Sequence, residues 1–300
     1  MSDGTANNAR ESHPYTRREF LQMMFGGAVG ICIGSPIAAG LLRYYLSAGP
    51  LPKQTDTPTP LIPTTEFPPD LVFTDKYHEY DDKAAEIIER VKKDFDVTIV
   101  SPTTWGESGK EQTNLPWRTR DIAYVAQAIS QLPPAYWHDS RSPREILLLR
   151  MPGSSSEGVG GGYANRRMIL YTSETFDPET QFRANESRRM YTTQGNHLRA
   201  AVCHEWTHSF MEGNPNIFAD FVKQAGWEQI VGKNEWKNLY PKNLIHDCEA
   251  DVYPSEDVAV SAGLMLVNPD FISQDRRNFF LTEPSYSNWP TVTDYRNHHP

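Results

Sequence analysis

Two histidines and a glutamate within five residues could hold a metal ion and activate water. His204, Glu205 and His208 form the pattern HExxH. On a helix, residues four apart lie on one face about one turn apart, so both imidazoles can reach one ion. The glutamate beside the first histidine faces the same cleft, where it can act as a general base. The spacing therefore predicts a catalytic zinc site on a helix.

The residues around this motif indicate that the helix is buried. Leu198, Ala201, Val202 and Phe210 are apolar or small and flank the motif on both sides. Burying two imidazoles and a carboxylate is costly unless a partner satisfies them, and a divalent cation is such a partner. Zn²⁺ is therefore the expected cofactor.

A catalytic zinc ion needs a third protein ligand and leaves a fourth position open. Position 214, six residues beyond His208, is Asn214, which excludes the extended histidine motif of the metzincins. The best candidate is Glu256, because Pro254 and Ser255 just before it are typical of a helix start. Its helix would be slim on the same face at Ala259, Val260 and Gly263, allowing a close approach to the HExxH helix. Three other carboxylates remain as alternatives: Glu249, Asp251 and Asp257.

The two segments together resemble a known family. HEWTHSF, followed some fifty residues later by PSEDVAV, is similar to the gluzincins whose second helix carries Pro-x-Glu-Asp-Phe-Ala-Glu, the lethal-factor-like metallopeptidases among them. The resemblance implies a zincin-like peptidase domain in which His204, His208 and Glu256 bind zinc and Glu205 is the general base. Val260 departs from the pattern, which usually has a second glutamate there.

The expected reaction is hydrolysis of a peptide bond by water that zinc and Glu205 activate. A strand at residues 166–171 is predicted to lie at a sheet edge, where an extended peptide could pair with it. Candidates to stabilise the oxyanion are Tyr163, Tyr253 and His246. Three alternatives stay open. One is a non-catalytic zinc-binding interaction domain, which Glu205 argues against, and another is a zinc hydrolase of a non-protein amide or ester. The third is a cell-surface interaction protein in which the histidines are incidental.

The pattern of apolar residues predicts the elements that must position this site. Helices are expected at residues 83–94 and 119–132, and strands after residue 95, at 145–150 and at 168–171. The glycine-rich run at 158–162 is expected to be a mobile loop beside the edge strand, and further helices at 197–213, 217–230 and 254–267. The predicted fold class is α+β, with a small sheet packed on the HExxH helix and on a second helix that carries the third ligand.

The amino-terminal part is expected to be an address rather than a domain. Residues 1–48 contain Arg17 and Arg18 before a weakly hydrophobic stretch, as in twin-arginine export signals, and predict a signal sequence or membrane anchor. Residues 49–70 are rich in proline and threonine and predict a linker. Residues 71–300 would then form one exported domain, tethered to the membrane or released from it.

Composition limits the partners. The chain has 300 residues and a net charge of −9, which is unsuited to binding a phosphate backbone, so nucleic acid is not an expected partner. The expected partners are a peptide or protein substrate and the membrane. Of the three cysteines, Cys203 and Cys248 could form a disulfide in an oxidising compartment, or both could be free thiols, while Cys32 lies in the amino-terminal segment.

Overall fold

The structure, a computed structural model, describes residues 82–105, 112–151, 159–164, 166–173, 190, 195–231, 233, 235–241 and 253–298. The predicted signal or anchor and the linker lie outside these residues and stay predictions. Four further residues named above also lie outside them: His246, Cys248, Glu249 and Asp251. Within the described part of the chain, no helix combines the length and apolar character that crossing a bilayer requires.

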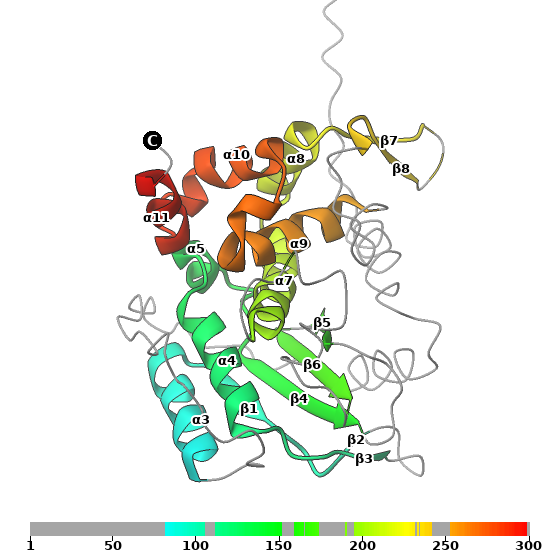
Figure 1. Ribbon diagram of the computed structural model, residues 1–300. Helices are drawn as coiled ribbons and strands as arrows, with labels where there is room; N and C mark the ends of the chain where they lie inside the picture. Colours follow the sequence, from blue (N-terminus) through cyan, green and yellow to red (C-terminus); the bar gives the residue numbers. More distant parts are fainter. Residues whose placement is uncertain are drawn as a thin grey trace, which may run out of the picture.

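A small mixed sheet supports one side of the molecule (Figure 1). Its strands, in spatial order, are β1 (Thr98–Val100), β4 (Glu145–Met151), β6 (Arg167–Ser173) and β5 (Val159–Ala164). β4 pairs in parallel with β1 and β6, whereas β5 runs antiparallel to β6. Two short antiparallel pairs complete the strands: β2 (Thr104–Trp105) with β3 (Gln112–Thr113), and β7 (Trp227–Gln229) with β8 (Trp236–Asn238).

Helices make up most of the described chain. The first are α3 (Asp82–Phe95), α4 (Thr119–Ser130) and the short α5 (Pro134–His138). The later ones are α7 (Asn196–Gly213), α8 (Pro215–Gln224), α9 (Pro254–Val267), α10 (Gln274–Thr282) and α11 (Pro290–His298), with single 3₁₀ turns at Pro269–Phe271 and Pro284–Tyr286. The fold is thus mixed α/β, rich in helix, with a small sheet.

α7 lies at the centre of this arrangement. It packs against α4, α9 and strand β5, and Figure 1 shows α8 to α11 gathered at the end of α7 that points away from the sheet. Its inner face contributes Val202, Trp206 and Phe210 to the core. The Trp206 ring packs edge-on against that of Trp137 in α5, with the ring centroids 4.9 Å apart. A helix buried on several sides gives fixed positions to the polar side chains it carries.

The structure corrects the prediction for the glycine-rich run. Residues 159–164 form strand β5, paired with β6 from Val159 opposite Thr172 to Ala164 opposite Arg167. A ladder of backbone hydrogen bonds needs no side chains, so glycines can form it where a neighbouring element approaches closely.

The same pairing shows that the predicted edge strand is wrong. β6, which contains residues 166–171 in large part, lies between β4 and β5 and is paired on both sides. In the described sheet, the edge on this side is β5.

The helix predicted at 217–230 ends early. α8 stops at Gln224, Gly226 adopts a positive φ of 75°, and the chain continues as β7. A left-handed residue cannot continue a right-handed helix, and glycine adopts that conformation at little cost. The helices at 119–130, 196–213 and 254–267 confirm their predictions within two residues at each end. No element was predicted after residue 267, where α10 and α11 lie.

Candidate metal centre

Two helices bring the polar side chains together. His204, Glu205 and His208 lie on the buried middle of α7, and Glu256 lies in the first turn of α9. α9 begins at Pro254, whose missing N–H and fixed φ suit a first helical position. The preceding residue, Tyr253, is extended, so the chain turns into the helix immediately before Glu256.

The three expected ligands face one another. The Nε2 atoms of His204 and His208 are 3.0 Å apart. The Nε2 of His204 is 3.2 Å from Oε2 of Glu256, and that of His208 is 3.4 Å from Oε1 of the same carboxylate. Ligand atoms about 2.0–2.1 Å from a tetrahedral zinc ion are themselves about 3.3 Å apart. One ligand atom from each of the three residues lies within 4.8 Å of the other two, so the three side chains could hold a metal ion.

The Glu256 carboxylate supports this fit independently of the distances. Its side chain is 0% exposed, and neither of its oxygens has a hydrogen-bond partner. Each oxygen instead lies within ion-pair distance of one imidazole nitrogen. A buried carboxylate without hydrogen bonds is expensive, and a cation between it and the two rings would remove that cost.

The ionisable groups of the site shift one another's pKa values. Burial acts to raise the pKa of Glu256, but the neighbouring His208 and His204 outweigh it and hold the pKa well below its usual range. For His208 the order is reversed: burial acts to lower its pKa, and the carboxylates of Glu256 and Glu205 raise it overall. The anionic form of Glu256 is the form that binds a cation, and a divalent cation would take the place of the proton that these carboxylates favour on His208, because a histidine ligand must be neutral.

Glu205 lies beside this group and is covered by the sheet. Its side chain is 3% exposed, and its Oε1 is 4.0 Å from Nε2 of His204. Burial raises the pKa of Glu205, partly offset by the two histidines. A Cβ added at Gly161 in β5 would lie 2.4 Å from this Oε1, so only glycine allows the strand to pass so close to the carboxylate.

The remaining predicted residues have other contacts or neighbours. Burial raises the pKa of Tyr163 to about 12, and its hydroxyl donates to the backbone carbonyl of Arg141 at 2.6 Å. Tyr253 is half-buried, three residues before Glu256, and its carbonyl accepts from the Asp257 amide at 3.0 Å. Cys203 is a buried free thiol, and burial raises its pKa to about 12.

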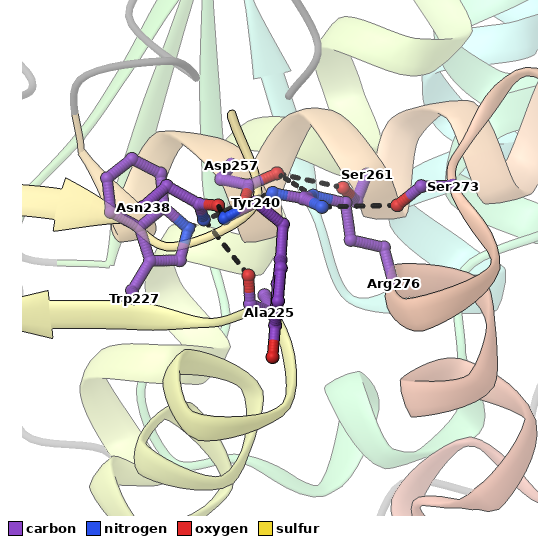
Figure 2. Close-up of polar contacts among 8 residues, drawn as sticks. All are labelled: Ala225, Trp227, Asn238, Tyr240, Asp257, Ser261, Ser273 and Arg276. Atoms are coloured by element: carbon purple, nitrogen blue, oxygen red, sulfur yellow. Dashed lines mark hydrogen bonds and ion pairs between the residues drawn. The ribbon is translucent and has the colours of Figure 1, made fainter. Parts of the chain in front are cut away.

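Of the alternative third ligands, Asp257 is bound elsewhere. Its two oxygens accept hydrogen bonds from Arg276, Trp227 and Ser261 on the far side of α9 (Figure 2). This cluster was missed from the sequence, because Asp257 and Arg276 are 19 residues apart and share no local pattern. Gly161 was missed as well, since the glycine run gave no sign of which position meets Glu205.

Comparison with known proteins adds little. The chain matches no protein-family model and no curated protein. It is similar to a crystal structure from Bacteroides caccae that carries the provisional description of a zinc-binding metallo-peptidase. The TM-score is 0.35 and the identity 15%, with 73% of this chain and 88% of that chain covered. So low a likeness does not establish a shared fold or activity.

Proposed function

We propose that this protein is a zinc-dependent metallopeptidase with a zincin-like domain. His204, His208 and Glu256 are the zinc ligands, and Glu205 is the general base. The observation that carries the proposal is the fully buried Glu256 carboxylate, whose oxygens have no hydrogen bond and lie 3.2 and 3.4 Å from two histidine nitrogens. A buried anion in this environment is explained by a cation between the three side chains.

Bound at this position, a zinc ion would supply Lewis-acid chemistry, lowering the pKa of water and polarising a carbonyl. The Glu205 carboxylate would accept a proton from the attacking water and then pass that proton to the leaving amine. Its position supports this role, because the carboxylate lies beside His204 and the packing of β5 restricts its movement. A buried carboxylate that is not a ligand has no evident use in a purely structural metal site.

The substrate backbone is proposed to pair with β5. In the described sheet this strand has a partner on one side only, and it crosses directly above Glu205. An extended peptide added to that edge would therefore pass close to the general base. Tyr253 and His246 remain proposed oxyanion groups, whereas Tyr163 would first have to give up its hydrogen bond to Arg141.

The proposal is tested on the full chain by measuring bound zinc and peptide cleavage in the parent and in Glu205→Gln. We expect one zinc per chain in both proteins, and a turnover at least about 100-fold lower in the variant, because the amide accepts no proton. Glu212→Gln is a matched control on the same helix, in a partly exposed residue that pairs with Arg141. It should retain the parent turnover.

Two results would contradict the proposal. If the parent protein still contains no zinc after attempted reloading, the proposed metal site is wrong. Zinc without cleavage of any peptide would favour the non-catalytic domain, or a hydrolase of non-protein amides or esters if such compounds are cleaved and Glu205→Gln abolishes that activity.

A further inference from the structure

Asp257, in the first turn of α9, accepts four hydrogen bonds. Its Oδ1 accepts from Nε of Arg276 at 2.6 Å and from the Ser261 hydroxyl at 3.3 Å. Its Oδ2 accepts from Nη2 of Arg276 at 2.6 Å and from the Trp227 indole at 2.7 Å. Figure 2 shows these groups converging on one carboxylate from α9, α10 and β7.

The partners of Asp257 are themselves held in place. Arg276 is 0% exposed, and its Nη1 donates to the Ser273 hydroxyl at 3.1 Å. Trp227 begins the β7–β8 pair, where the Asn238 amide donates to the carbonyl of Ala225 at 3.0 Å. Asp257 thus ties the start of α9 to two other elements through groups with little freedom to move.

Glu256, the adjacent residue, has the opposite environment. It is equally buried, but its oxygens face the two imidazoles at 3.2 and 3.4 Å, so its position depends on those rings and on any ion between them. Consecutive helix residues point about 100° apart, so Asp257 faces α10 and β7 while Glu256 faces the histidines of α7. Any rotation of the first turn moves both side chains together.

A small rotation would be sufficient to disturb the metal site. A carboxylate about 6 Å from the helix axis moves about 2 Å when the helix turns by about 20°. Metal–ligand distances tolerate only about 0.2 Å. The bidentate contact of Arg276 with Asp257 resists such a rotation, because both parallel hydrogen bonds would be broken by it.

We propose that Asp257 and Arg276 are positioning residues for the zinc site, whose ion pair sets the rotation of the first turn of α9 and so holds the Glu256 carboxylate between His204 and His208. This inference depends on the proposed zinc site and adds the residues that orient its third ligand. Arg276 also balances the charge of Asp257, so that two adjacent buried carboxylates do not repel one another uncompensated.

The test compares Arg276→Lys with the parent as full-length chains. Lysine keeps the positive charge but has no planar fork and makes no bidentate contact. The affinity for zinc is measured by competition with a chelator under conditions where both proteins are folded, and cobalt(II) binding is followed by its absorption spectrum. We expect zinc to bind about 10–100-fold more weakly to the variant, with an altered cobalt spectrum.

A matched control separates positioning from general loss of stability. Val91→Ala removes buried atoms from α3, an element that packs mainly on α4 and β1. It should lower the stability of the protein without changing its zinc affinity or cobalt spectrum. Should Arg276→Lys not fold, Trp227→Phe removes a single hydrogen bond to Asp257 and should weaken zinc binding by a smaller factor.

The outcomes distinguish this inference from the function on which it depends. If the parent binds zinc and the variants bind it equally tightly with an unchanged cobalt spectrum, the positioning role is wrong while the zinc site stands. If the parent binds no zinc, both are wrong. Weaker binding in Val91→Ala to the same extent as in Arg276→Lys would also overturn the positioning role, because the effect would then follow stability alone.

Discussion

Three buried carboxylates in this protein differ in the groups that stabilise their negative charge. Asp257 has four hydrogen bonds to its carboxylate, Glu256 has none, and Asp121 has arginines nearby. Burial removes the same hydration from all three, so their partners decide which charge is favoured. Asp121, in the first turn of α4, is the residue at which this balance is readily measured, because it is distant in sequence from the proposed zinc ligands.

Burial raises the pKa of Asp121 to about 6 from its ordinary 3.8, although Arg120, Arg118 and Arg150 act to lower it. A raised pKa means that the protonated carboxyl favours the folded state. The contribution of Asp121 to the free energy of unfolding is fully present below pH 3.8 and is lost as the pH rises through about 6. The whole contribution is about 3 kcal/mol. Between pH 5 and pH 7 the parent should therefore lose about 1 kcal/mol of unfolding free energy more than Asp121→Asn.

Urea unfolding at both pH values, with a chelator present to exclude metal effects, measures this difference. A parent and variant whose unfolding free energies change equally with pH would show that Asp121 ionises normally.

At the scale of elements, close approach of backbones brings the site together. α7 and α9 touch where Gly263 meets Ala200. The contact is so close that a Cβ at Gly263 would lie 2.8 Å from the Ala200 carbonyl oxygen. The sequence predicts a small residue at this position, because the two helices must approach closely. β5 approaches α7 in a similar way at Gly161, which lies against Glu205. α9 and β5, two of the elements that pack on α7, are thus both in contact with it at glycines.

Gly161→Ala and Gly162→Ala form a matched pair of changes in β5. A Cβ at Gly161 would overlap the Glu205 side chain at 2.4–2.6 Å, whereas one at Gly162 meets nothing within 4 Å. We expect Gly161→Ala to lower the free energy of unfolding by about 1–3 kcal/mol and to lower turnover as Glu205 moves. Gly162→Ala should be neutral or slightly stabilising in urea unfolding. Equal effects of both changes would show that β5 does not press on Glu205.

At the scale of the whole molecule, α7 connects the sheet side to the helical side. The proposed ligands come from α7 and α9, which join these two parts, so bound zinc would add a link that the unfolded chain lacks. Ligands that bind only the folded state raise its stability by mass action.

Zinc at about 100 times its dissociation constant should add about 2.7 kcal/mol. In a domain of this size that raises the Tm by about 5–10 °C. Thermal unfolding of the full chain with zinc and with a chelator measures this shift, and Glu256→Gln should show a much smaller one. An identical Tm in both conditions would contradict a specific zinc site.

The sequence alone determined those features that depend on local period and local chemistry. Helices at 119–130, 196–213 and 254–267 follow from apolar spacing and from Pro254, and the HExxH spacing places two histidines on one face of a helix. Glu256 could be preferred over Asp257 because adjacent helix residues point in different directions. All of these depend on residues within a few turns of one another.

Only the tertiary structure decided which distant segments meet. It made the glycine run a strand, moved the sheet edge from β6 to β5, ended α8 before Trp227, and paired Asp257 with Arg276. Backbone pairing and buried ion pairs join residues far apart in the chain, and their geometry depends on how the whole core packs. No local pattern contains that information, because the free energy of each contact depends on neighbours that folding alone brings together.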